Sequence, residues 1–225
     1  MERTYIYAQW LVTVLIMQLW AVNSFAQYNN QWAGEIKAFS KLDSAAGFPA
    51  DGLILFTGSS SIRNWQDPQK DFNNDKIINR GFGGSQIIDL IENFDQVILK
   101  YKPERIVIYS GDNDVFAGKS ADHVYGDFCT LYGMVKASLP NTKVIYIAIK
   151  PSLARWSLWT EMLKANTKIN SFLSDKENDW FVDVYSPMTG LAGKPDAKYF
   201  NGDGLHMTKE GYELWTKVLA PYLIK

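Results

Sequence analysis

Residues 53–62 of the chain read Leu53-Ile54-Leu55-Phe56-Thr57-Gly58-Ser59-Ser60-Ser61-Ile62. A short apolar run that is followed by a glycine and a cluster of serines predicts a buried parallel strand ending in a tight turn. Open α/β sheets bind their ligands in the crevice at the carboxyl ends of the strands. The three consecutive hydroxyl groups therefore either cap the next helix or supply a nucleophile with polar neighbours.

Further short apolar stretches along the chain are also predicted to form strands. They are residues 77–80, 105–110, 143–149 and 180–184. We expect helices over residues 85–102, 120–139, 160–175 and 208–223, with a short leading helix in residues 28–39. Loops are expected over residues 64–74, 151–159 and 185–201. Five strands that are mostly separated by helices predict an α/β fold, in which a parallel sheet has helices on both faces.

The composition excludes some classes of protein. The 225 residues are 47% hydrophobic and 21% charged, which suits one globular domain with a substantial core. The formal net charge of -1 gives no basic footprint of the kind that nucleic-acid-binding proteins carry, so we expect no nucleic-acid partner. Cys129 is the single cysteine, so the chain forms no intrachain disulfide.

The first 26 residues have the pattern of an export signal. Arg3 supplies a positive charge, residues 10–22 are largely apolar, and Ser24-Phe25-Ala26 offers small residues to a signal peptidase. The apolar run is shorter than the roughly 20 residues that span a bilayer, which favours cleavage over a retained anchor. We therefore expect a single domain in residues 27–225, periplasmic or extracellular, without stable membrane insertion after cleavage. The oligomeric state stays open.

Four turns carry the residues that suggest chemistry. Three of them follow predicted strands, and the fourth precedes the last helix; they are residues 58–61, 81–84, 111–114 and 201–206. Asp203 and His206 in the fourth turn are three residues apart, a spacing that puts two side chains on one face of a helical turn. A carboxylate in that position can accept a hydrogen bond from imidazole Nδ1 and leave Nε2 free as a base.

Such a base gives a serine its nucleophilic character, because an unassisted hydroxyl is a weak nucleophile. Ser60, at the tip of the first turn, is the expected recipient. The oxyanion that forms must find hydrogen-bond donors, and the candidates are the backbone N–H groups of Ser60 and Gly84 and the side-chain amide of Asn113. A glycine lets substrate approach the backbone closely, and an amide side chain donates without bringing net charge.

At these residues the sequence resembles the SGNH, or GDSL-type, hydrolases. That family carries a serine in Gly-Asp-Ser, a glycine, an asparagine in Gly-x-Asn-Asp and a histidine in Asp-x-x-His, and the same order occurs here at 58–60, 79–84, 111–114 and 203–206. The resemblance implies Ser60 as nucleophile, His206 as base and Asp203 as its orienting group, with Gly84 and Asn113 as oxyanion donors. It also implies a flavodoxin-like three-layer α/β/α sandwich with strand order 2-1-3-4-5, and no metal or organic cofactor.

One position departs from the family pattern. Ser59 stands where the family has the aspartate that precedes the nucleophile. Because that aspartate is not a member of the triad, we expect the mechanism to survive with altered support of the turn. Ser59 and Ser61 are rival nucleophiles, and the alignment with Gly-Asp-Ser favours Ser60.

The expected activity is that of a secreted serine esterase that works through an acyl-enzyme and removes short acyl groups, such as acetyl, from a small-molecule or glycan ester. Trp65, Trp156 and Trp159 fall in expected loops, where they either line the substrate site or pack against the protein. A lysophospholipase, an O-acyltransferase and a catalytically silent carbohydrate-binding protein are the alternatives.

Overall fold

The computed structural model describes residues 31–49, 51–190 and 193–223. The expected signal in residues 1–26 lies outside these residues. The chain divides into two compact units, residues 1–44 and residues 45–225. Helix α2 (Ala33–Ala46) begins in the first unit, later than the helix expected in residues 28–39. The sheet and the candidate site belong to the second unit, and the expectation of a single domain over residues 27–225 stays a prediction.

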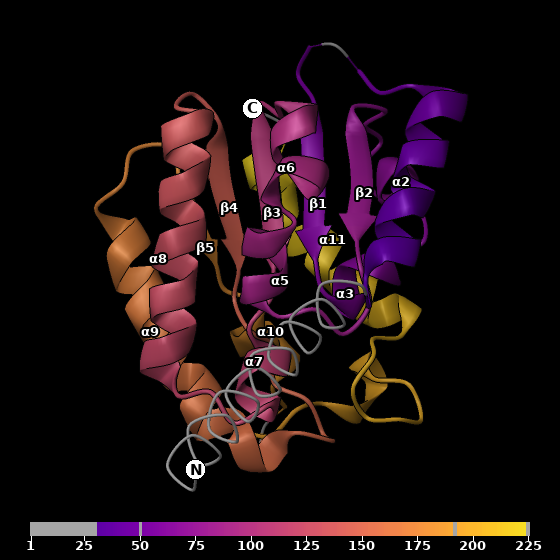
Figure 1. The fold of residues 1–225 in the computed structure, drawn as a ribbon. Helices are drawn as coiled ribbons and strands as arrows, with labels where there is room; N and C mark the ends of the chain where they lie inside the picture. Colours follow the sequence, from indigo (N-terminus) through magenta and orange to yellow (C-terminus); the bar gives the residue numbers. More distant parts are fainter. Residues whose placement is uncertain (1–30, 50, 191–192, 224–225) are drawn as a thin grey trace, which may run out of the picture. The chain divides into compact units, whose positions relative to one another are not determined.

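The strands form one parallel sheet in the order β2-β1-β3-β4-β5 (Figure 1). Their bounds are β1 (Ile54–Gly58), β2 (Ile77–Gly81), β3 (Arg105–Tyr109), β4 (Lys143–Ile147) and β5 (Trp180–Val182). All residues of the neighbouring strands β1 and β3 are buried. Such continuous burial requires cover on both faces of the sheet. The expected α/β class and the expected strand order are confirmed.

The helices and turns of 3₁₀ helix fill the connections between the strands. They are α3 (Ser60–Arg63), α4 (Pro68–Asp71), α5 (Ile87–Glu92), α6 (Phe94–Val97), η1 (Leu99–Tyr101), α7 (Asp112–Phe116), α8 (Ala121–Ser138), η2 (Trp156–Leu158), α9 (Trp159–Ser174), α10 (Tyr185–Met188), η3 (Ala197–Tyr199) and α11 (Lys209–Leu223). Figure 1 shows α5, α8 and α9 on the near side of the sheet and α11 on the far side.

Ring contacts show that helices cover both faces of the sheet. Phe128 of α8 lies edge-on to Tyr146 of β4, with ring centroids 4.9 Å apart. Trp215 of α11 lies 5.0 Å from Tyr109 of β3. Tyr146 is in register with Ile108, the residue before Tyr109, and successive strand residues point to opposite faces. The two tyrosines therefore lie on opposite faces, as a three-layer α/β/α sandwich requires.

Several connections differ from the expected elements. The helix expected over residues 85–102 is divided into α5, α6 and η1, and Asn93 lies at the break, where its side chain donates to the carbonyl of Asp89 at 2.9 Å. Asparagine competes in this way with regular helical hydrogen bonding. The loop expected over residues 64–74 contains α4, because Asp67 caps its N-terminus and Pro68 takes its first position. The loop expected over residues 185–201 contains α10 and η3.

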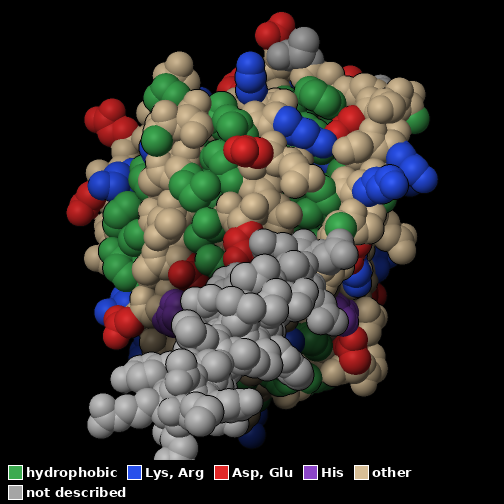
Figure 2. Space-filling model, in the orientation of Figure 1, with side chains coloured by type: hydrophobic (Ala, Val, Ile, Leu, Met, Phe, Trp, Pro, Cys, Tyr) green, Lys and Arg blue, Asp and Glu red, His purple; other side chains and the backbone are tan. Residues whose placement is uncertain are grey.

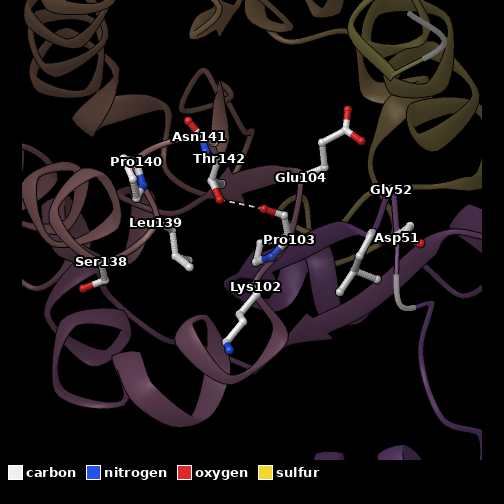
Figure 3. Close-up of a pocket in the computed structure, with 11 residues that line it drawn as sticks. Asp51, Gly52, Lys102, Pro103, Glu104, Ser138, Leu139, Pro140, Asn141 and Thr142 are labelled. Atoms are coloured by element: carbon white, nitrogen blue, oxygen red, sulfur yellow. Dashed lines mark hydrogen bonds between the residues drawn. The ribbon is translucent and has the colours of Figure 1, made fainter.

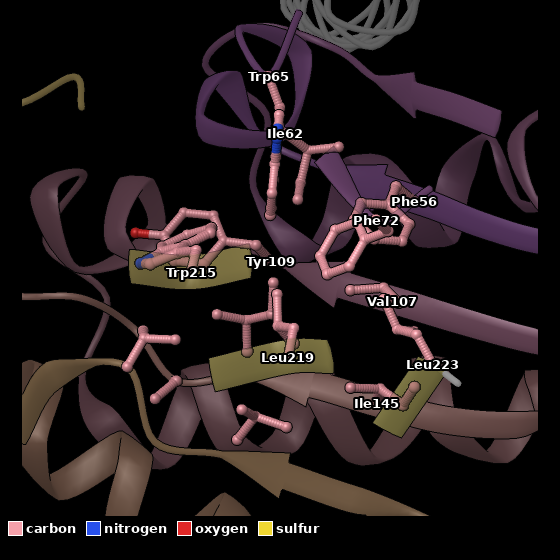
Figure 4. Packing of buried hydrophobic residues seen from close by; sticks show 14 of the residues in the cluster. Phe56, Ile62, Trp65, Phe72, Val107, Tyr109, Ile145, Trp215, Leu219 and Leu223 are labelled. Carbon is pink, nitrogen blue, oxygen red and sulfur yellow. The ribbon is translucent and has the colours of Figure 1, made fainter. Parts of the chain in front are cut away.

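Figure 4 shows the hydrophobic core between the sheet and α11. Trp65 is part of it, since its side chain is 2% exposed and its ring lies 5.6 Å from Phe56 and 6.0 Å from Trp215. Asn79 Nδ2 donates to the carbonyl of Trp65 at 3.1 Å, which fixes the segment after α3 against β2. The expectation that Trp65 lines the substrate site is therefore corrected: this tryptophan is a core residue.

The surface carries charges of both signs. Figure 2 shows acidic and basic side chains interspersed over the described part of one face. Among the described residues, no helix combines the length and the apolar character needed to cross a membrane. The expected absence of a nucleic-acid partner stays a prediction.

Candidate active site

The structure places the side chains of the expected triad in contact. Ser60 is the first residue of α3, directly after β1, and His206 lies in the turn before α11. Ser60 Oγ is 3.0 Å from His206 Nε2. His206 Nδ1 is 2.6 Å from Asp203 Oδ2. Folding thus brings together a hydroxyl from the first part of the second unit's sequence and an imidazole and a carboxylate from its last part.

Hydrogen bonds hold Asp203 in its ionised form. Its Oδ1 accepts from the backbone N–H groups of Leu205 and His206, each at 2.9 Å. The Leu205 N–H and then the imidazole of His206 lower the pKa of Asp203 to about 2. An ionised carboxylate only accepts hydrogen bonds, so the neutral imidazole carries its proton on Nδ1 and a lone pair on Nε2. The hydroxyl of Ser60 then donates to Nε2, as general-base activation requires.

Three strand ends meet at the start of α3. The N–H of Phe82, just after β2, donates to the carbonyl of Gly58 at 2.9 Å, and the N–H of Ser59 donates to the carbonyl of Tyr109 at 2.9 Å. Gly58 has a φ of +124°, and a Cβ atom there would lie 1.9 Å from the Tyr109 carbonyl oxygen. This close approach requires glycine at the end of β1.

The three neighbouring serines have different surroundings. Ser59 is 0% exposed, and its Oγ has no hydrogen-bond partner among the described residues. Ser61 is 3% exposed. Ser60 is partly exposed and is the serine that contacts His206. The geometry therefore favours Ser60 over its two rivals.

The other two expected oxyanion donors lie in adjoining turns. Gly84 is exposed in the turn after β2, with a φ of +74°. Asn113 is the second residue of α7, and its Nδ2 donates to the carbonyl of Ser85 at 3.0 Å. This bond places the amide of Asn113 beside the residue that follows Gly84. The N–H of Gly84 and the second Nδ2 hydrogen of Asn113 have the chemistry that an oxyanion site needs.

Comparison with protein families decides where this arrangement belongs. The model of the GDSL-like lipase/acylhydrolase family matches residues 43–214. The chain belongs to this family. It is therefore an SGNH/GDSL-type hydrolase, and the resemblance seen in the four sequence blocks is confirmed. No curated protein matches the chain.

Solved structures share the fold of this GDSL-type hydrolase. A protein from Streptococcus pneumonia that is named for platelet activating factor is 23% identical, with a TM-score of 0.75 over 91% of this chain and 99% of that one. A GDSL-like lipase from Bacteroides thetaiotaomicron is 22% identical, with a TM-score of 0.72 over 84% of this chain and 97% of that one. An acetylxylan esterase from Geobacillus stearothermophilus is 13% identical, with a TM-score of 0.65 over 78% of this chain and 95% of that one.

The two remaining tryptophans of the expected substrate site stack on each other. The rings of Trp156 and Trp159 are 6.0 Å apart with an interplanar angle of 14°, and both side chains are half-buried. Tyr185 contacts Trp159 edge-on at 5.5 Å. Trp156 lies in η2, within the connection from β4 to α9, and Trp159 is the first residue of α9. This connection starts at the same edge of the sheet as the turn carrying Ser60. That the pair lines the substrate site stays a prediction.

Two buried cations contact the turns that carry Asn113 and His206, and neither cation belongs to a motif of the sequence. Lys150 is 1% exposed, and its Nζ donates to the carbonyl of Leu205 at 2.9 Å. Arg155 is 8% exposed and donates to both Asp112 and Asn113. Burial lowers the pKa of Lys150 to about 8. Their place just after the fourth strand, where α/β sheets bind ligands, is the sequence signal that could have pointed to them.

A separate cavity of 350 Å³ lies at the opposite edge of the sheet (Figure 3). Its walls come from the residues that precede the strands, including Leu53 before β1, Glu104 before β3 and Thr142 before β4. The Thr142 hydroxyl donates to the carbonyl of Pro103 at 2.6 Å. Because Ser60 and His206 lie at the carboxyl ends of the strands, this cavity is distinct from the candidate active site.

Proposed function

We propose that this GDSL-type hydrolase cleaves carboxylic esters through a covalent acyl-enzyme at Ser60. The 3.0 Å contact between Ser60 Oγ and His206 Nε2 carries this proposal, because it aligns a hydroxyl with a base. The bond from His206 Nδ1 to Asp203 supports it, because it fixes the tautomer that the base requires.

Acylation begins when Ser60 Oγ attacks the carbonyl carbon of the ester and its proton passes to His206 Nε2. The carbonyl oxygen becomes an oxyanion, and the N–H groups of Ser60 and Gly84 and the amide of Asn113 are its proposed donors. The bond from carbon to the alcohol oxygen then breaks. His206 gives its proton to that oxygen, the alcohol leaves, and the acyl group stays on Ser60.

Deacylation repeats these steps with water as the nucleophile. Water gives a proton to His206 Nε2 and attacks the acyl carbon, and the second oxyanion occupies the same donors. The bond from the acyl carbon to Ser60 Oγ breaks, and His206 returns the proton to Oγ. The products are the free acid and the unmodified enzyme. Asp203 stabilises the imidazolium in both halves without taking the proton.

For the substrate we propose a short acyl ester, in particular acetate, on a carbohydrate. The stacked and half-buried pair Trp156 and Trp159 supports this proposal, because indole rings present flat apolar surfaces of the kind that sugar rings stack against. The fold is also that of an acetylxylan esterase. The exposed side chains of Phe116 and Leu153 favour the second candidate, an acyl-lipid substrate such as a lysophospholipid.

A substrate panel tests the proposal. Acetylated sugars, aryl acetates, longer-chain aryl esters and lysophospholipids are compared with the wild-type enzyme and Ser60→Ala. We expect Ser60→Ala to lower turnover by roughly 10⁴–10⁶, and Asn113→Ala by roughly 10²–10³. Ser59→Ala is the matched control, since it removes a buried hydroxyl that has no hydrogen-bond partner in the part of the chain that the structure describes, and it should leave turnover close to wild type. Near wild-type hydrolysis by Ser60→Ala would exclude the assignment.

The same panel distinguishes the alternatives. Preference for acetylated sugars supports the carbohydrate proposal, whereas preference for lysophospholipids supports the second candidate. Transfer of the acyl group to an added sugar, in competition with water, identifies an O-acyltransferase on the same residues. Binding of glycans without any turnover identifies the catalytically silent protein.

We further propose that the enzyme is exported, with residues 1–26 removed as a signal. The charged start, the short apolar run and the small residues at 24 and 26 support this proposal. Expression in a Gram-negative host followed by intact-mass measurement of the periplasmic protein tests it. We expect the mass of a chain that begins at residue 27. A full-length chain retained with the membrane fraction would contradict the proposed cleavage and export.

A further inference from the structure

The side-chain amide of Asn113 stabilises an oxyanion only if its nitrogen, and not its oxygen, faces the substrate. An amide can rotate by half a turn with little change in shape, so its neighbours must select one orientation. The structure gives Asn113 one neighbour at each end. Nδ2 donates to the carbonyl of Ser85 at 3.0 Å, and Oδ1 accepts from Arg155 Nη1 at 3.0 Å.

These two neighbours have opposite and fixed hydrogen-bonding character. A backbone carbonyl only accepts, and a guanidinium only donates. In a rotated amide, the oxygen of Asn113 would face the Ser85 carbonyl and the NH₂ group would face Arg155, so both bonds would be lost. One orientation therefore satisfies both neighbours, and it leaves the second Nδ2 hydrogen for a ligand.

Arg155 is itself held firmly. The same Nη1 atom donates to Asp112 Oδ2 at 3.0 Å, and both side chains are less than one tenth exposed. The guanidinium carbon also lies 4.3 Å from the centre of the Phe116 ring. A buried ion pair with a second contact on its face restricts the guanidinium to one position. Asn113 therefore meets a fixed donor rather than a mobile surface cation.

The segment that carries Arg155 also contacts the turn of the proposed base. The N–H of Ala154 donates to the carbonyl of Gly204 at 3.0 Å, and Lys150 Nζ donates to the carbonyl of Leu205 at 2.9 Å. Residues 150–155 thus contact both Asn113, a proposed oxyanion donor, and the turn that carries His206. The position of the guanidinium is thereby tied to the position of His206.

We propose that Arg155 is a positioning residue for oxyanion stabilisation, which acts through Asn113 by fixing the orientation of its amide. This inference rests on the proposed function, because it assumes that Asn113 donates to the oxyanion. Among the described residues, Arg155 forms no hydrogen bond or ion pair with Ser60 or His206, and the hydrogen-bond partners of its side chain are Asp112 and Asn113. Removal of the Arg155 side chain should therefore weaken stabilisation of the transition state more than it weakens the binding of substrate.

A double-mutant cycle with Asn113 tests the proposal. Arg155→Met is made in the wild type and in Asn113→Ala, and kcat and KM are measured with an aryl acetate. In the wild type we expect kcat to fall about 10- to 100-fold with little change in KM, because misplacement of a catalytic group by about 1 Å has such an effect. In Asn113→Ala we expect no further fall, since the group through which Arg155 acts is already gone.

Lys119→Met is the matched control. Lys119 lies just after α7 and forms ion pairs with Asp114 of that helix, at 2.9 Å, and with Asp127 of α8, at 2.8 Å. Within the described part of the chain it forms no hydrogen bond or ion pair with Asn113. Its removal disturbs the structure of the turn without touching the amide. Any effect of Lys119→Met on kcat should be the same in the wild type and in Asn113→Ala.

The outcomes separate the inference from the proposed function. An equal fall of kcat on Arg155→Met in both backgrounds would show a merely structural role and overturn the inference. Near wild-type activity of Asn113→Ala would also overturn it, whereas activity of Ser60→Ala would refute the proposed function itself. If Arg155→Met does not fold, Arg155→Lys replaces it in the cycle, because the shorter lysine keeps a positive charge at this position and removes the Nη1 atom that bonds Asn113. It should show the same dependence on background.

Discussion

At the scale of single residues, Lys150 links the candidate site to the stability of the fold. Its side chain is 1% exposed, and burial lowers its pKa to about 8, against about 10.4 for an exposed lysine. Between these two values the unfolded chain keeps the proton and the folded chain releases it. The free energy of unfolding therefore rises with pH over this window, whereas below it Lys150 lowers the free energy of unfolding by an amount that does not change with pH.

Lys150→Met removes this dependence and keeps most of the side-chain volume. Denaturant unfolding of the wild type and of Lys150→Met at pH 7, 8, 9 and 10 measures the difference in their free energies of unfolding. We expect the stability of the wild type relative to Lys150→Met to increase from about pH 8 to about pH 10. A difference that stays constant over this range would show that the ammonium is not desolvated in the folded protein.

Residue chemistry explains which parts of the site were predictable from sequence. Ser60, Asp203 and His206 occur in short motifs whose spacing reflects local turns, so their meeting could be predicted. Arg155 acts across the fold on Asn113 and has no such spacing. The sequence left two roles open for Trp65, because nothing in the composition of its loop shows which side chains turn inward. Only the packing against Phe56 and Trp215 decides between these roles.

At the scale of elements, the end of β1 controls the position of Ser60. Gly58→Ala would place a Cβ atom 1.9 Å from a backbone oxygen of β3. Backbone atoms cannot move away cheaply, so we expect loss of folding or of more than about 3 kcal/mol of stability, together with loss of activity. Thermal unfolding and ester hydrolysis measure the two effects.

Gly126→Ala is the control for this substitution. Gly126 is exposed within α8, and a Cβ atom there meets no atom within 4 Å. Alanine favours helix over glycine by about 0.5–1 kcal/mol, so the variant should be slightly more stable and fully active. A Gly58→Ala protein as stable as Gly126→Ala would contradict the close contact between β1 and β3.

Helices and strands with long hydrophobic runs were predicted well. Short helices were predicted less well, because single capping side chains determine where they begin and end. β1, β3 and α8 follow from their apolar pattern. The division between α5 and α6 depends on the side chain of Asn93 and its bond to Asp89, and α4 depends on the cap at Asp67. Such local hydrogen bonds involve one or two residues and leave no periodic signal in the sequence.

At the scale of the whole molecule, the core between the sheet and α11 holds the second unit together. Leu219 of α11 is 0% exposed in this core, whereas Leu163 of α9 is 37% exposed. We expect Leu219→Ala to lower the free energy of unfolding by about 2–5 kcal/mol. Leu163→Ala, a matched helical substitution, should change it by no more than about 0.5 kcal/mol. Equal losses in denaturant unfolding would contradict the described packing.

The most direct test of the central claim is the reaction of the enzyme with a fluorophosphonate, followed by peptide mass spectrometry. Activation of Ser60 by His206 predicts a single adduct on Ser60, no adduct in Ser60→Ala, and a strongly slowed reaction in His206→Ala. An adduct on Ser59 or Ser61, or esterase activity without any adduct on Ser60, would contradict the account.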